Sequence, residues 1–190
     1  MKVINLYQEE KELIELAVEN NRQAQHKLYS KFSSKMLGVC HQYIKDLQQA
    51  EDIMITAFMK AFTNLQHFEH KGSFEGWIRR IMINECISFI RVQKKVKFIE
   101  DETYFEESHN NIESKFSVED IQFLIDNLPD GYKMVFNLYC IEGFKHQEIA
   151  TMLGINEGTS KSQLSHARKM LQDNIIKLKN YEMSVNKSNR

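Results

Sequence analysis

The most informative stretch of the chain is HQEIATMLGINEGTSKSQLSHARKML, at residues 146–171. Apolar residues recur at helical spacing before Gly154, which allows the left-handed backbone conformation that ends many helices. Asn156 is a residue type that commonly caps the start of the next helix. We therefore predict a short helix over 146–153, a tight turn, and a longer helix from 157 to about 178, which together make a helix-turn-helix.

Two further features of this stretch favour DNA binding over a plain helical hairpin with a solvated face. Ala150 is small where two helices would cross steeply, and Ile155 would fill the space beneath the turn. The second helix would present polar and basic side chains to the outside, where they can meet base edges and phosphates. These candidate DNA-binding residues are Thr159, Lys161, Ser162, Gln163, Ser165, His166, Arg168 and Lys169.

The rest of the chain also carries helical patterns. One proline and seven glycines in 190 residues argue against an all-β fold, and 42% hydrophobic residues suffice for a packed core. Apolar residues at three- and four-residue steps predict helices over 28–44, from the Asp46 cap to about 65, and from 74 to at least 91. We predict an all-α protein of two small helical domains joined by an acidic linker.

Charge is strongly segregated, although the net charge of the chain is only −1. Residues 77–97 carry a net charge of +5, residues 98–130 carry −9, and residues 131–190 carry +4. We predict a first domain over 1–97, a flexible acidic linker over 98–117, a second domain over 118–180 and a frayed tail over 181–190. The linker is either a solvated spacer, which we favour, or an autoinhibitory segment that screens the basic faces.

Several classes of protein are disfavoured. The three cysteines are widely spaced and form no CxxC pair, so neither a metal site nor a disulfide framework is expected. The chain has no motif of a nucleophilic, zinc-dependent or nucleotide-dependent enzyme, so we expect no catalysis and no cofactor. It has no apolar run long enough for a membrane span and no signal peptide, which predicts a cytoplasmic protein.

The first predicted domain ends in a basic and aromatic block over residues 77–97. Basic side chains follow phosphates, and aromatic rings can stack on unpaired bases. Taken alone, Trp77 on an apolar helix stripe fits a core position better than a stacking platform. The block by itself therefore favours nucleic-acid binding only modestly.

Longer motifs give the block its context. They are DLQQAEDI at 46–53, FMKAF at 58–62, GSFEGWIRRI at 72–81 between Phe68 and Asn84, Leu128–Pro129, EGFKHQEIA at 142–150 and GINEGT at 154–159. In this order, with an acidic segment in the middle, the chain resembles bacterial RNA polymerase sigma factors of the extracytoplasmic-function group, in the sigma-70 family. The first three motifs resemble conserved region 2 of that family, and the last three resemble region 4.

The resemblance implies a non-catalytic subunit that directs core RNA polymerase to promoters. It implies docking through Glu51, Asp52 and Phe58 on the clamp of the β′ subunit, with further contact to the flap of the β subunit. Of these, we expect Asp52 to be exposed and charged and Phe58 to be largely buried. The loop 69–73 and Asn84 would hold a flipped base of the minus-10 element, and the second helix of the helix-turn-helix would read the minus-35 element. The implied minus-10 and melting residues are Lys71, Ser73, Phe74, Trp77, Arg80, Asn84, Arg91, Lys94 and Lys95.

Further expectations concern partners. The resemblance implies an anti-sigma factor, often membrane-anchored, and we expect a monomer when the chain is free. The alternative is a helix-turn-helix transcription regulator with a helical sensor domain, which would bind duplex DNA without polymerase. The sequence also departs from the family pattern: Ile55 and Thr56 replace a usual Gln and Glu, Ser88 replaces an Asp, Ser160 replaces an apolar residue, and Gln163 and His166 replace basic ones.

Overall fold

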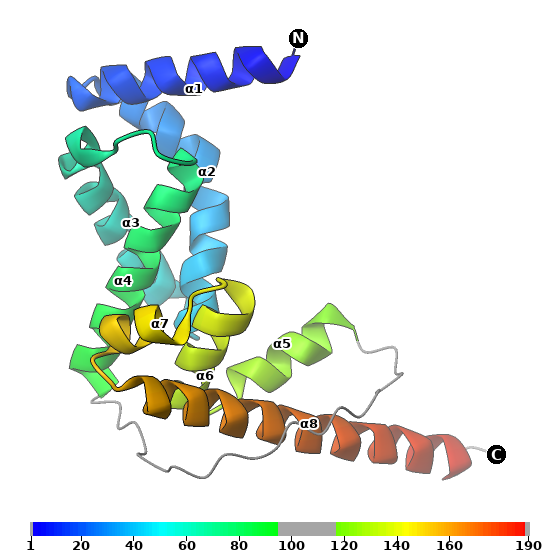
Figure 1. Cartoon of the computed structure of the whole chain (residues 1–190). Helices are drawn as coiled ribbons and strands as arrows, with labels where there is room; N and C mark the ends of the chain where they lie inside the picture. Colours follow the sequence, from blue (N-terminus) through cyan, green and yellow to red (C-terminus); the bar gives the residue numbers. More distant parts are fainter. Residues whose placement is uncertain (1, 95–116, 189–190) are drawn as a thin grey trace. The chain divides into compact units, whose positions relative to one another are not determined.

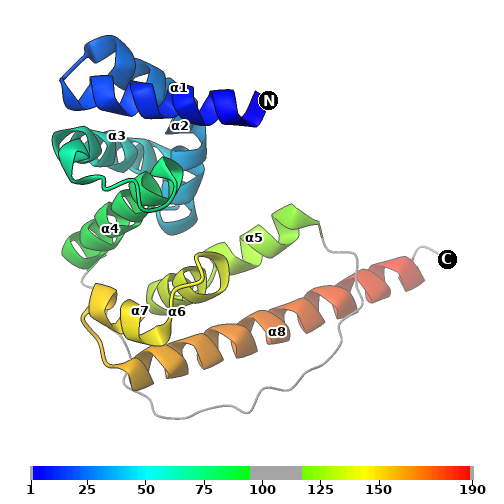
Figure 2. The ribbon, with the colours of Figure 1, turned by 45° about the horizontal axis from the view of Figure 1, so that its top comes forward.

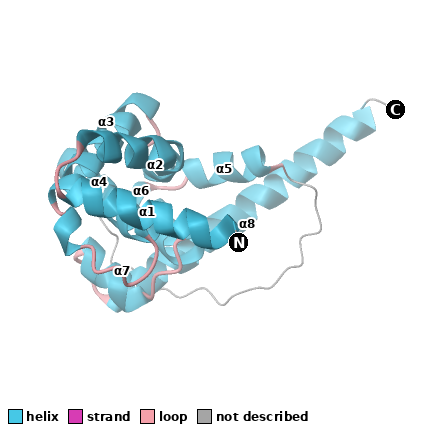
Figure 3. Cartoon of the chain, turned by 90° about the horizontal axis from the view of Figure 1, so that it is seen from above, coloured by secondary structure: helices cyan, strands magenta, loops and turns pink. Residues whose placement is uncertain are grey.

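The computed structural model describes residues 2–94 and 117–188, and the chain divides into two compact units, Met1–Lys94 and Lys95–Arg190. Within these described ranges the chain forms helices and no strands, so the predicted all-α class is confirmed (Figure 3). None of the helices described is long and apolar enough to cross a membrane. The predicted linker 98–117 lies outside the described residues except for Ser117.

The first unit contains four α-helices and one short 3-10 turn in the part that is described. They are α1 (Lys2–Val18), α2 (Arg22–Tyr43), α3 (Leu47–Thr63), η1 (Leu65–His67) and α4 (Phe74–Lys94). Helices α2, α3 and α4 pack against one another, and α1 packs on α2 (Figure 1). The predicted cap of α3 is confirmed, because a carboxylate oxygen of Asp46 accepts a hydrogen bond from the backbone N–H of Gln49 at 2.8 Å.

The core of this unit continues up to the start of α4. Phe74 is buried, and its ring lies 5.5 Å from the ring of Phe32 on α2 and 5.5 Å from that of Phe68. Cys40 and Cys86 are also fully buried. The aromatic cluster therefore anchors both ends of the loop that precedes α4.

The second unit is built along one long helix (Figure 2). Its elements are α5 (Val118–Asp126), α6 (Asp130–Phe136), a π-helical turn η2 (Asn137–Ile141), α7 (His146–Leu153) and α8 (Glu157–Ser188). The predicted helix-turn-helix is present as α7, the turn and α8. Gly154 is left-handed with φ 68° and ψ 37°, and Oδ1 of Asn156 accepts a hydrogen bond from the backbone N–H of Thr159 at 2.6 Å.

Two expectations for this unit were wrong. Helix α8 continues to Ser188, beyond the predicted end near 178. Residues 181–188 are therefore helical and do not form the predicted frayed tail. No glycine or proline occurs between 159 and 188, so the sequence contains no strong helix breaker there.

Candidate nucleic-acid interface

The first turns of α8 divide into an inner and an outer side. Ser160, Leu164 and Ala167 are buried and face the other helices of the unit. Lys161, Ser165 and Arg168 follow one another at steps of four and three, and so lie along one line of the helix surface. Lys161 and Lys169 are exposed, whereas Ser165, His166 and Arg168 are half-buried. The two lysines of the predicted DNA-binding surface are therefore accessible to solvent.

Three of the predicted DNA-binding residues do not have the expected exposure. Thr159, Ser162 and Gln163 are buried, so the prediction that they are exposed was wrong. The hydroxyl of Thr159 donates to Oδ1 of Asn156 at 2.9 Å, and that of Ser162 donates to the backbone O of Thr159 at 3.1 Å. Gln163 lies three residues after Ser160 and four before Ala167, so it shares the side of these fully buried residues.

Ser160, where the family commonly has an apolar residue, has a polar partner. Its Oγ lies 2.9 Å from Nδ1 of His146, the first residue of α7. The imidazole ring stacks on the ring of Tyr139 at a centroid distance of 4.5 Å. Burial, followed by the charge of Lys161, lowers the pKa of His146 below its ordinary value, so the ring is neutral at pH 7.

The loop before α4 is exposed and held in a defined conformation. Lys71, Gly72 and Ser73 are all exposed, and Gly72 has a φ of 105°. The side chain of Ser73 accepts a hydrogen bond from the backbone N–H of Gly76 at 3.1 Å, which caps the first turn of α4. Nζ of Lys71 lies 2.6 Å from a carboxylate oxygen of Glu69. This loop therefore offers accessible polar groups on a rigid support.

The exposed side of α4 continues from this loop. Arg80, Asn84 and Arg91 are exposed and recur at steps that place them on one face. Lys94 is the last residue of α4, and Lys95 lies outside the described residues.

The two aromatic residues assigned to the minus-10 site belong mainly to the core. Phe74 is 2% exposed, so its side chain is not accessible for the minus-10 contact that the resemblance implied. Trp77 is half-buried, and its ring lies 5.8 Å from that of Phe74 and 5.4 Å from that of Phe68. Packing against these rings accounts for both positions, and only Trp77 remains partly exposed.

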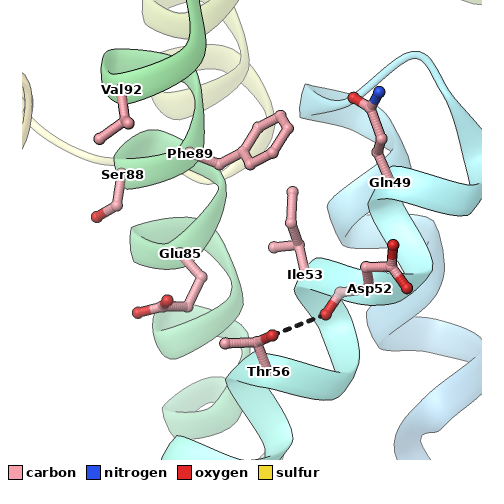
Figure 4. A pocket seen from close by; sticks show the side chains of 8 residues that line it. All are labelled: Gln49, Asp52, Ile53, Thr56, Glu85, Ser88, Phe89 and Val92. Carbon is pink, nitrogen blue, oxygen red and sulfur yellow. Dashed lines mark hydrogen bonds between the residues drawn. The ribbon is translucent and has the colours of Figure 1, made fainter.

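A groove lies between α3 and α4, with a volume of ≈ 420 Å³ (Figure 4). Asp52 is exposed and Phe58 is 2% exposed, so the sequence placed both correctly. On α3, Asp52, Ile55, Thr56 and Met59 are all exposed and share one face. The groove is lined by Gln49, Asp52, Ile53, Thr56, Glu85, Ser88, Phe89 and Val92.

The cysteines and other potential metal ligands form no cluster that could hold a metal ion in the described parts of the chain. Within residues 2–94 and 117–188, no three His, Cys, Asp or Glu side chains lie together as a metal site would require. The neighbouring Cys40 thiol and burial both raise the pKa of Cys86, so this thiol stays protonated. Burial also raises the pKa of Cys140, against the opposing effect of Arg168.

Comparison with known proteins agrees with this arrangement. Residues 28–96 match the family Sigma-70 region 2, and residues 119–171 match the family Sigma-70, region 4. The chain is 30% identical over 135 residues to RNA polymerase sigma factor SigV of Bacillus subtilis, covering 71% of this chain and 81% of that protein. It is 27% identical over 178 residues to RNA polymerase sigma-H factor of Pseudomonas aeruginosa, covering 86% and 92% respectively.

A solved structure shows the same fold. It is the sigma factor RpoE in complex with the anti-sigma factor NepR from Bartonella quintana, with a TM-score of 0.50 and 22% identity. The match covers 78% of this chain and 94% of that one. The helix-turn-helix, the helical first unit and these relatives lead to one conclusion: the chain belongs to the sigma-70 family, in its extracytoplasmic-function group, and is a non-catalytic factor that directs RNA polymerase to promoters.

Proposed function

We propose that the two units divide promoter recognition between them. In this proposal α8 reads the minus-35 element as duplex DNA, and the loop 69–73 with α4 binds the melted minus-10 strand. The observation that carries it is the turn itself, where left-handed Gly154 and the Asn156 cap set α8 across α7. This geometry leaves Lys161 and Lys169 exposed at the start of α8, as major-groove docking requires.

The minus-10 part of the proposal rests on the first unit. Exposed Lys71 and Ser73 precede a line of Arg80, Asn84 and Arg91 on α4. Arginines can bind phosphates along a single strand, while an amide such as that of Asn84 can hydrogen-bond a base edge. Flipping a base costs a few kcal/mol, which contacts of this kind can offset.

Docking on the polymerase is assigned to α3. Its exposed face combines the carboxylate of Asp52 with apolar Ile55 and Met59, beside the groove shown in Figure 4. Such a face suits a helical partner that supplies basic side chains and an apolar anchor, and we assign it to the clamp of the β′ subunit. The second unit would bind the flap of the β subunit. The domains would be 1–97 and 118–180, with the linker 98–117 between them.

Regulation and location follow from the same proposal. The sigma factor from Bartonella quintana is in complex with an anti-sigma factor. In our proposal a partner of this kind would cover the polymerase-binding face of α3 and hold the factor inactive. The factor would act as a monomer in the cytoplasm, where promoter DNA and polymerase meet.

The test is in vitro transcription with purified core polymerase over fragmented genomic DNA of the source organism, with gel shifts run with and without core. We expect discrete promoter-specific transcripts that require both the chain and core polymerase. Sequence-specific duplex binding in the absence of core, together with no transcripts, would instead support the transcription regulator with a sensor domain.

A further inference from the structure

The π-helical turn η2 places Tyr139 against side chains of α7 and α8, the two helices of the helix-turn-helix. The turn is closed by a hydrogen bond from the backbone N–H of Glu142 to the backbone O of Asn137 at 3.0 Å. Short π-helical turns are rare and occur frequently at functional sites. Tyr139 lies within this turn and is half-buried, so it is not a fully enclosed core residue.

The ring of Tyr139 contacts side chains from both helices of the helix-turn-helix. Its centroid lies 4.5 Å from that of the His146 ring, with an angle of 22° between the planes. The guanidinium carbon of Arg168 lies over the Tyr139 ring, 5.8 Å from its centroid, within the range of a cation–π contact. His146 is tied in turn to Ser160 on α8 through the 2.9 Å contact of Nδ1 with Oγ. Tyr139 is therefore linked to α8 at two points, directly and through His146.

Among the residues in contact with Tyr139, Arg168 is the one that belongs to the predicted DNA-binding surface. It lies on the same line of α8 as Lys161 and Ser165, and it is half-buried. A free arginine side chain loses rotamer entropy when it binds a phosphate, and a ring that already restrains the guanidinium reduces this loss. The planar guanidinium stacks on aromatic faces in a way that an ammonium group does not reproduce.

We propose that Tyr139 is a positioning residue for DNA binding, whose ring holds the guanidinium of Arg168 in place for a phosphate of the minus-35 duplex. The proposal rests on the assignment of α8 to that duplex. Tyr139 itself makes no contact with DNA in this proposal. Its effect passes through Arg168, while His146 and Ser160 hold the ring in register with α8.

The test measures the affinity of the reconstituted holoenzyme for a promoter duplex obtained by binding-site selection. The variants are Tyr139→Leu, Tyr139→Phe, Arg168→Ala and the double variant, each checked for folding by thermal unfolding of the full chain. From the size of cation–π contacts at partly exposed sites, Tyr139→Leu should weaken binding about three-fold. Tyr139→Phe keeps the aromatic ring and should bind the duplex with wild-type affinity. In the Arg168→Ala background, Tyr139→Leu should have no further effect.

A second variant keeps the test decisive if Tyr139→Leu unfolds the chain. Arg168→Lys retains the charge but loses the planar stacking group, so it should weaken binding to the extent expected for Tyr139→Leu. Wild-type affinity of Arg168→Lys would overturn the inference, because stacking on the ring would then be dispensable.

Equal weakening by Tyr139→Leu with and without Arg168 would overturn the positioning role, because the effect would not pass through the guanidinium. Weakening by Arg168→Ala with a silent Tyr139→Leu would overturn this inference alone. A silent Arg168→Ala would overturn both the inference and the assignment of Arg168 to the DNA surface.

Discussion

Substitution of Gly154 by alanine probes the turn on which the helix-turn-helix depends. Gly154 has φ 68° and ψ 37°, the left-handed conformation, in which a β-carbon is strained. For an L-residue without a compensating hydrogen bond this conformation costs roughly 1–2 kcal/mol. In a domain of this size each kcal/mol lowers the melting temperature by about 4–8 °C. Gly154→Asn should retain most of the stability, because asparagine tolerates the left-handed region.

Gly143 provides a matched control. It is also left-handed, with φ 75°, and nothing lies within 4 Å of a β-carbon built on it, but it lies outside the turn between α7 and α8. Gly143→Ala should therefore lower the melting temperature by a similar amount. Only Gly154→Ala should also weaken promoter binding by the holoenzyme, by up to about 5- to 30-fold if DNA must restore a relaxed turn.

The two readouts are thermal unfolding followed by circular dichroism and promoter affinity of the reconstituted holoenzyme. The reasoning about the turn would be refuted if Gly154→Ala left the melting temperature unchanged. It would also be refuted if both alanine variants weakened promoter binding equally, because general destabilisation would then explain the loss.

Three further predictions concern other parts of the chain. Asp52→Lys should weaken binding to core polymerase in a pull-down and leave the melting temperature unchanged, since Asp52 is exposed on α3, whereas Glu12→Lys on α1 should leave core binding intact. The pKa of His146 is lowered, so the unfolded chain binds more protons near pH 6 than the folded chain does. The stability of the second unit should therefore fall as the pH drops below about 6.5. Unfolding measured at several pH values should show a weaker dependence for His146→Asn, and an unchanged one for His26→Gln in the first unit. A thiol reagent should modify exposed Cys140 in the native chain and reach the two buried cysteines only on unfolding; rapid native modification of all three would contradict their burial.

Local sequence signals predicted the elements of the fold that depend on near neighbours. Gly154 and Asn156 mark the turn because a left-handed glycine and a side-chain cap are properties of single residues. The cap at Asp46 is of the same kind. Burial of Phe58 followed from helical periodicity, because apolar residues three and four apart share one face.

Features that depend on contacts between distant residues were not predictable in the same way. Gln163 is polar but lies on the side of α8 that packs inward, and Phe74 belongs to an aromatic cluster supplied by α2 and the preceding loop. The pairing of His146 with Ser160 joins two helices, although a polar residue at an expected apolar position was a signal that a partner existed. The π-helical turn carries no period of its own in the sequence, and the groove between α3 and α4 exists only once both helices are packed.

The division of promoter recognition between the two units is tested most directly by transcription from a promoter library randomised at both the minus-10 and minus-35 elements. Holoenzymes carrying wild-type factor, Ser165→Arg and Asn84→Ala would be compared by sequencing their transcripts. Because arginine pairs preferentially with guanine, Ser165→Arg should shift one minus-35 position towards guanine and leave the minus-10 preference unchanged. Asn84→Ala should relax one minus-10 position only. If either variant altered the other element, or if both returned the wild-type consensus, the assignment of the two units would be contradicted.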